Sequence, residues 1–195
     1  MDMLKRIRER TAIRKYCDKM VPKEIIDQII QAGIWGPSLM GPGFQPWKIV
    51  VVKGKGNIEK INKIITEELC MPGVGKNLIL RTTIGVISSA PVVFFVYSDS
   101  AVINFVKRLD DGYESFADMA EVSAISAAIQ NMILVADSLG VGSCWLDAPL
   151  FCQKEINNFF NTNQKLIAVL TLGYSVKKSS RSPRKPIGES VVYFD

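Results

Sequence analysis

The sequence predicts an α+β fold in which helices and strands alternate irregularly. Four β-branched, apolar segments have strand character, and the segments between them carry apolar residues at helical spacing, but too unevenly for a regular βαβ ladder. No Gly-x-Gly-x-x-Gly motif follows any predicted strand, which argues against a dinucleotide-binding Rossmann unit. With 195 residues the chain can bury one large core, so we expect a single domain over residues 1–195.

The individual elements follow from the periodicity of the apolar residues. Helical spacing predicts helices over residues 2–9, 23–35, 57–69, 77–87, 119–139 and 153–160. Runs of β-branched and apolar residues predict buried strands over residues 47–52, 90–97, 143–146 and 166–172.

Several element boundaries have a local cause. Pro22 suits the start of the second helix, where its missing N–H is harmless, and Gly36-Pro37 ends that helix. Asn57 is expected to cap the third helix. Pro91 stands at the beginning of a strand, where it removes no ladder hydrogen bond.

Two segments suggest contacts beyond the single chain. Residues 119–139 are apolar on nearly every side, so this helix is expected to be central in the domain or inside a subunit interface. The polar pair Gln130-Asn131 makes a membrane span the weaker interpretation, and we expect this pair to satisfy buried polar neighbours. Val191–Phe194 is apolar but has no obvious strand partner nearby, so we expect it to cross to another subunit.

Composition narrows the possible chemistry. Hydrophobic residues make up 48% and charged residues 22% of the chain, and its start lacks an apolar signal region, so we expect a soluble, cytoplasmic protein. The chain has no histidine, which excludes a Ser-His-Asp or Cys-His nucleophile and an imidazole base. Cys17, Cys70, Cys144 and Cys152 form no C-x-x-C pair, so no metal site is expected. An enzyme of this composition needs a cofactor for its chemistry.

Basic residues gather at both ends of a chain whose formal net charge is +5. Nucleic-acid binding is one explanation for such clusters. However, the basic segments are not interleaved with aromatic residues, and no nucleic-acid-binding motif accompanies them. A small phosphate-bearing cofactor held by both termini fits better, while a solvated basic surface explains some of the lysines.

Five segments occur in a recognisable order along almost the whole chain. They are Arg10-Thr-Ala-Ile-Arg14-Lys-Tyr16; Pro37-Ser38 with Gln45-Pro46-Trp47; Ala128-Ile-Gln-Asn-Met-Ile-Leu134; Leu139-Gly-Val-Gly-Ser-Cys-Trp145; and Leu172-Gly-Tyr174 with Pro183-Arg-Lys-Pro186 and Glu189. In this order they resemble the nitroreductase family of FMN-dependent oxidoreductases. The resemblance implies a mixed, largely antiparallel sheet flanked by helices, and a homodimer that exchanges its C-terminal strands and binds two FMN molecules.

The resemblance also implies an activity. NADH or NADPH reduces the flavin, and a nitroaromatic, a quinone or a related acceptor then takes the electrons in a ping-pong cycle, with no catalytic side chain. Other flavin chemistry, such as dehydrogenation or dehalogenation, is an alternative. A non-catalytic FMN sensor and a nucleic-acid-binding protein are the alternatives that are not enzymes.

The residues that match the family pattern define an expected cofactor site. Arg10 corresponds to a phosphate ligand, and Arg14 to the basic residue near the pyrimidine edge of the flavin. The remaining expected cofactor-binding residues are Thr11, Ala12, Pro37, Ser38, Leu39, Trp145, Leu146, Asp147, Ala148, Arg181 and Arg184.

Within this set the three residues at 37–39 would contact the flavin of the other subunit, those at 145–148 would face flavin N5 and O4, and the C-terminal arginines would bind the phosphate. Two features depart from the pattern. Ala12 stands where the family usually has serine, and the loop over residues 39–44 is two residues longer and lacks the usual asparagine.

Overall fold

In the computed structural model of the chain, residues 2–38, 44–69, 78–109, 112–177, 179 and 181–194 are described. Four strands form one antiparallel sheet in the order β1 (Trp47–Lys53), β2 (Val92–Ser98), β4 (Lys165–Gly173) and β3 (Gly142–Leu146). An isolated parallel bridge joins Ala12 to Ser143 at the outer edge of β3. The architecture confirms the predicted α+β class with a largely antiparallel sheet.

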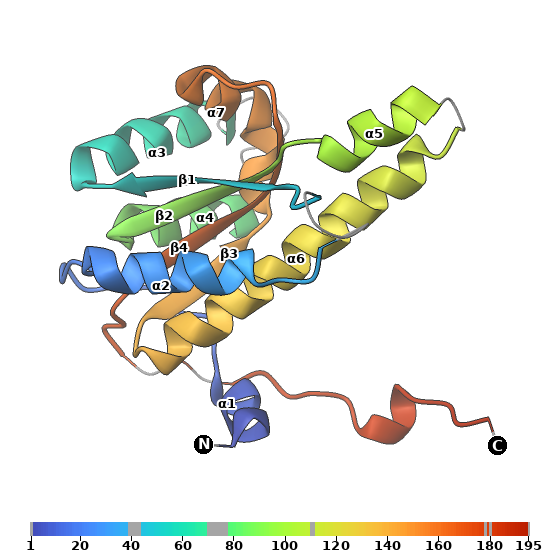
Figure 1. The fold of residues 1–195 in the computed structure, drawn as a ribbon. Helices are drawn as coiled ribbons and strands as arrows, with labels where there is room; N and C mark the ends of the chain where they lie inside the picture. Colours follow the sequence, from blue (N-terminus) through green and yellow to red (C-terminus); the bar gives the residue numbers. More distant parts are fainter. Residues whose placement is uncertain are drawn as a thin grey trace.

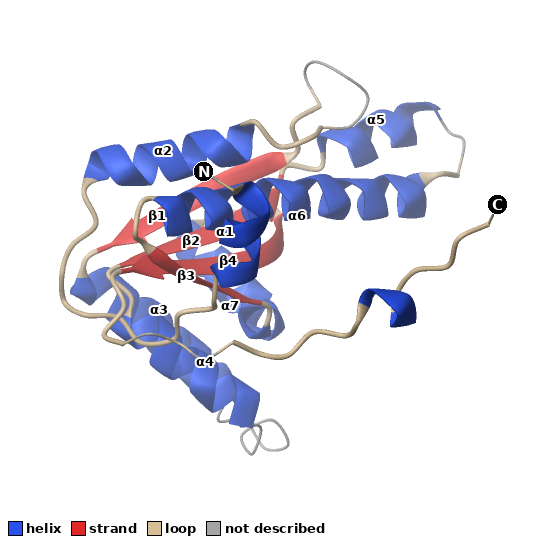
Figure 2. Ribbon diagram, turned by 90° about the horizontal axis from the view of Figure 1, so that it is seen from below, coloured by secondary structure: helices blue, strands red, loops and turns tan. Residues whose placement is uncertain are grey.

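The sheet lies between two layers of helices, as Figures 1 and 2 show. On one face, α2 (Lys23–Ile34) packs against α6 (Glu114–Ser138). On the other face lie α3 (Lys55–Leu69), α4 (Leu78–Ser89), η1 (Ala148–Cys152) and α7 (Gln153–Phe160). The described chain also contains α1 (Met3–Glu9), α5 (Ala101–Leu109) and η2 (Ile187–Glu189).

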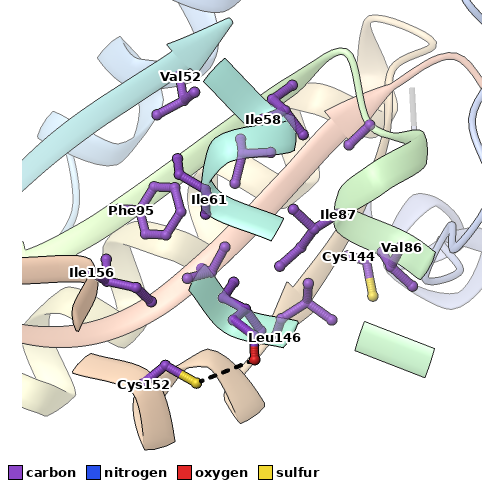
Figure 3. Close-up of a cluster of buried hydrophobic side chains, with 14 of the residues drawn as sticks. Val52, Ile58, Ile61, Val86, Ile87, Phe95, Cys144, Leu146, Cys152 and Ile156 are labelled. Atoms are coloured by element: carbon purple, nitrogen blue, oxygen red, sulfur yellow. Dashed lines mark hydrogen bonds between the residues drawn. The ribbon is translucent and has the colours of Figure 1, made fainter. Parts of the chain in front are cut away.

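The central strand β2 is buried along its whole length because both of its faces are covered. Val93, Phe95 and Tyr97 belong to the core under α3 and α4, whereas Phe94 and Val96 belong to the core under α2 and α6. This division follows the two-residue period of a strand and explains why β2 reads as a continuous apolar run. Figure 3 shows the first of these cores, with Phe95 between side chains from α3, α7 and β1.

Some predicted boundaries were wrong. The helix α3 begins at Lys55, because Gly54 turns the chain at φ +88° and its carbonyl accepts the first helical hydrogen bond from Ile58 N (3.2 Å). Asn57 therefore lies inside the helix and does not cap it. The helix α6 begins at Glu114, before the expected residue 119, and α5 was not predicted at all.

The long helix α6 is apolar and long enough to span a membrane, but in this fold it is a core helix. Ala128, Ile129 and Met132 are fully buried against the sheet and α2. A Cβ atom at Gly33 of α2 would lie 2.1 Å from Met132 Cε, so the two helices approach closely at that glycine. Gln130 is exposed in the single chain, and the expectation that it pairs with buried polar groups was wrong.

The C-terminal arm, residues 181–194, leaves the body of the protein and extends past α1 (Figures 1 and 2). Val192, Tyr193 and Phe194 are 77%, 78% and 95% exposed. The arm forms no strand within the described part of the chain, so its exchange between subunits stays a prediction.

Candidate functional site

The arginine-bearing segment near the N-terminus is attached to the edge of the sheet. Ile13 N donates to Ser143 O (2.9 Å), and Cys17 N donates to Tyr174 O (2.9 Å). These bonds connect the segment to β3 and to the residue that follows β4. As a result, Arg10 and Arg14 lie on a backbone segment that is fixed to the antiparallel pair of strands β3 and β4.

A cavity of about 450 Å³ lies where this segment meets the start of the C-terminal arm. The residues that line it are Ile7, Arg8, Arg10, Thr11, Ala12, Arg14, Ser179, Arg181, Ser182 and Arg184. Five of these are arginines and none is acidic, so the lining offers a dense set of permanently charged hydrogen-bond donors. Guanidinium groups bind phosphate oxygens in a bidentate manner. The chemistry of this cavity therefore suits a phosphate group.

A second cavity of about 410 Å³ lies at the C-terminal end of β3. Its lining consists of Arg14, Thr82, Thr83, Val86, Cys144, Trp145, Leu146, Asp147 and Ala148. Arg14 lines both cavities, so the phosphate-type cavity and the β3 cavity are adjacent. Both volumes lie in the range typical of small-molecule sites, roughly 300–1,000 Å³.

Two residues in the lining of the β3 cavity have a defined chemical state. Trp145 Nε1 donates to Asp147 Oδ1 (2.6 Å), which orients the indole. Burial raises the pKa of the Cys144 thiol, and nearby Arg14 and Arg10 only partly oppose this shift. Cys144 is therefore a protonated core thiol, packed near Val86 in Figure 3, rather than an activated nucleophile.

The structure brings together most of the residues predicted for the site. Arg10, Thr11, Ala12, Arg14, Arg181 and Arg184 meet at the first cavity, and Trp145, Leu146, Asp147 and Ala148 line the second. Arginines from opposite ends of the sequence thus converge.

Three predicted residues do not join these cavities. Pro37 and Ser38 follow α2 and are exposed, and neither lines the described walls of the two cavities. Leu39 and most of the longer loop lie outside the described residues. The contribution of all three to a cofactor site stays a prediction that needs a second subunit.

Sequence reasoning missed the wall contributed by α4. Thr82, Thr83 and Val86 line the β3 cavity, but they belong to no motif singled out from the sequence. The one available signal was a pair of adjacent threonines in a helix with many apolar residues. A larger cavity of about 840 Å³ between α3 and α4 has both lysines and glutamates in its lining, and so it does not match an anionic ligand.

Comparison with known proteins identifies the family. Residues 7–174 match the family model described as "Nitroreductase family". The chain belongs to the nitroreductase family. This membership confirms the recognition made from the sequence motifs, and with it the expectation of an oxidoreductase enzyme.

The relatives that the chain resembles are named for different activities. A Methanothermobacter thermautotrophicus protein, provisionally named NADH dehydrogenase/NAD(P)H nitroreductase, is 32% identical over 89% of this chain and 78% of its own length. Iodotyrosine deiodinase of Hydra vulgaris is 28% identical over 95% of this chain and 70% of its own.

Among solved structures, the BluB-like flavoprotein of Clostridium difficile 630 superposes with a TM-score of 0.81 and 26% identity, with complete coverage of both chains. A nitroreductase with bound FMN from Bacteroides fragilis has a TM-score of 0.73 at 19% identity, again with complete coverage of both chains. These superpositions confirm the nitroreductase-type fold.

Proposed function

We propose that this protein is an FMN-dependent oxidoreductase that uses NADH or NADPH to reduce nitroaromatics, quinones or related acceptors. The observation that carries the proposal is the position of Arg14 between an arginine-lined cavity and the cavity at the end of β3. One mononucleotide can extend across both, with its phosphate in the first and its ring in the second. The FMN named for solved relatives supports this assignment.

The residues present fit FMN by their chemistry. Arg10, Arg181 and Arg184 would hold the phosphate, and Arg14 would place positive charge beside the ring. The backbone of residues 145–148 would orient the ring, as the family resemblance implies. When bound, FMN supplies hydride acceptance from NAD(P)H and electron transfer to the second substrate in a ping-pong cycle. The protein contributes orientation and electrostatics, because the chain has no histidine and the described residues that line the site include no activated thiol.

We also propose that the protein is a homodimer. The exposed apolar arm needs a surface to cover it, and Trp35 on the α2 side is 80% exposed as well. The outer edge of β1 has no strand partner among the described residues and is available for an added strand. A second subunit would also bring Pro37 and Ser38 to a flavin. We also propose that the enzyme is cytoplasmic, on the basis of the composition of the chain and the proposed function.

A second candidate function is reductive dehalogenation of an aromatic substrate. Its support is the similarity to iodotyrosine deiodinases, including 27% identity to the Sus scrofa protein over 95% of this chain. Parallel steady-state assays with a nitroaromatic, a quinone and an iodinated phenol, each with NADH and NADPH, separate the two candidates.

An absorption spectrum of the purified protein tests the proposed function directly. We expect a flavin spectrum that bleaches on anaerobic addition of NAD(P)H. The double variant Arg10→Ala/Arg184→Ala should lose FMN, because it removes two phosphate donors from one cavity. The control Lys60→Ala/Lys154→Ala removes the same charge from exposed positions on α3 and α7 and should retain FMN. A colourless wild-type protein that FMN cannot reconstitute would exclude the proposal.

A further inference from the structure

Tyr16 follows the arginine segment and lines the larger cavity between α3 and α4; it is not part of the lining of the β3 cavity. Its side chain is 5% exposed, and its hydroxyl group lies 2.7 Å from Ile13 O and 2.8 Å from Thr171 Oγ1. Ile13 immediately precedes Arg14. Thr171 is paired across the sheet with Cys144, which immediately precedes Trp145. One hydroxyl group therefore contacts both the arginine segment and the strand that supports β3.

The direction of these hydrogen bonds can be assigned from the available protons. Burial raises the pKa of Tyr16 above its usual range, so the hydroxyl keeps its single proton. The Ile13 carbonyl can only accept, and at 2.7 Å it takes this proton. The Thr171 hydroxyl is then left to donate to Tyr16 Oη or to Cys144 O, which lies 3.3 Å away. The result is a buried relay of bonds from the Arg14 backbone to β3.

Two glycines make room for this arrangement. Gly142 and Gly173 are paired across the β3–β4 ladder. A Cβ atom at Gly142 would lie 2.6 Å from Ile13 Cγ1, and one at Gly173 would lie 2.5 Å from Pro91 Cδ and 2.9 Å from Tyr16 Cδ1. A side chain at Gly142 would therefore meet Ile13 of the arginine segment, and one at Gly173 would meet both Pro91 and Tyr16. The close approach is thus a specific feature of this part of the sheet.

We propose that Tyr16 is a positioning residue of the FMN site, whose hydroxyl group holds the Arg14 backbone in register with the end of β3. The proposal rests on the proposed function. Arg14 lines both cavities, so a shift of its backbone changes the donors offered to the phosphate and the charge beside the ring together. Tyr16 itself touches neither expected ligand group and acts through Ile13 and Thr171.

The variant Tyr16→Phe tests this role, and the chain provides a matched control. Tyr97 is a fully buried tyrosine of the same core, and its hydroxyl has no hydrogen-bond partner among the residues that the structure describes. Tyr97→Phe therefore makes the same chemical change without breaking a hydrogen bond. We expect Tyr16→Phe to raise the dissociation constant for FMN by about tenfold and to shift the flavin absorption bands, since a buried carbonyl loses its donor. Tyr97→Phe should stay within about twofold of wild type.

Thr171 variants separate positioning from general loss of packing. Thr171→Ser keeps the hydroxyl and should retain wild-type FMN affinity, whereas Thr171→Val removes the hydroxyl at similar volume and should weaken binding less than Tyr16→Phe does. Equal FMN affinity and an unchanged spectrum in Tyr16→Phe and Tyr97→Phe would overturn the proposal.

Hydrogen exchange of the flavin-free protein distinguishes this inference from the proposed function. The amides of residues 12–17 should exchange faster in Tyr16→Phe than in Tyr97→Phe, whether or not FMN binds. Unchanged exchange in this segment would refute the role of Tyr16. Failure of the wild-type protein to bind FMN would instead count against the proposed function.

Discussion

At the scale of single residues, the site depends on side chains whose neighbours restrict what they can do. Arg14 borders two cavities, and Ala12 in the same segment lines the phosphate-type cavity with a methyl group. A hydroxyl group at position 12 would add a donor to a lining that is already rich in guanidinium groups. The departure from the usual serine therefore has a measurable consequence.

The variant Ala12→Ser should bind FMN more tightly than the wild-type protein. One added hydrogen bond to a charged phosphate contributes about 1–2 kcal/mol, which corresponds to roughly a tenfold lower dissociation constant. Fluorescence titration of the flavin measures the change. Ala12→Cys adds similar bulk with a weak donor and should give a much smaller gain. Equal affinities for the serine variant and wild type would contradict the assignment of this cavity to the phosphate.

Cys152 predicts how stability changes at alkaline pH. Its thiol is fully buried, and burial, together with nearby Glu68 and Glu155, raises its pKa to about 11 from an ordinary value of 9.0. Because the folded state holds this proton more tightly, the stabilisation is complete below about pH 9 and is lost as pH rises toward 11.

Unfolding in urea between pH 8 and pH 11, compared with a Cys152→Ala variant, measures this contribution. Over this range the free energy of unfolding of the wild-type protein should fall by at most about 3 kcal/mol more than that of the variant. Parallel pH profiles for the two proteins would show that the thiol is not protected from ionisation.

At the scale of elements, the position of α5 depends on a buried carboxylate from α6. Glu121 is 1% exposed, and its Oε1 accepts from Val102 N (2.7 Å) and Ile103 N (3.1 Å) in the first turn of α5. Its other oxygen accepts from Ser98 Oγ at the end of β2. The carboxylate thus occupies the place of an N-terminal cap and joins α5, α6 and the sheet.

Glu121→Gln should destabilise the protein by about 2–3 kcal/mol, since it replaces charge-assisted hydrogen bonds and brings an amide N–H₂ group to face donors. Chemical denaturation measures the free energy of unfolding, and hydrogen exchange at Val102 and Ile103 should accelerate. Glu59→Gln, at an exposed position of α3, serves as the control and should change stability little. Similar effects of the two substitutions would argue against the capping role.

At the scale of the whole molecule, the single chain leaves apolar surface that it does not cover itself. The C-terminal arm extends into solvent, and the apolar residues Met3 and Leu4 of α1 are 61% and 54% exposed. A truncation after Pro186 removes the end of the arm without removing any strand pairing of the described sheet.

The truncated chain should therefore fold but fail to dimerise at concentrations at which the full chain is dimeric. Light scattering coupled to size-exclusion chromatography measures the mass, and thermal denaturation checks the fold. Replacement of Tyr193 and Phe194 by serine keeps the length of the arm and should weaken the dimer in the same direction. A truncated protein that remains dimeric would show that the arm does not hold the subunits together.

The sequence by itself determined the class of the fold and most of its elements. The strands and helices over residues 23–35, 90–97 and 166–172 follow from apolar periodicity, which is a local property. The five sequence motifs also indicated the family. The start of α3 and the existence of α5 were missed, because Gly54 sets the first and a glutamate from another helix caps the second.

Only the tertiary structure decided how the site is assembled. Three features depend on how the chain folds back on itself. The arginines at 10 and 14 converge with those at 181 and 184, and α4 contributes a wall to the β3 cavity. The hydroxyl groups of Tyr16 and Thr171 are in contact although the two residues are 155 positions apart. Local sequence patterns record which segments bury a face. They carry no information about which distant side chains meet once those faces have packed.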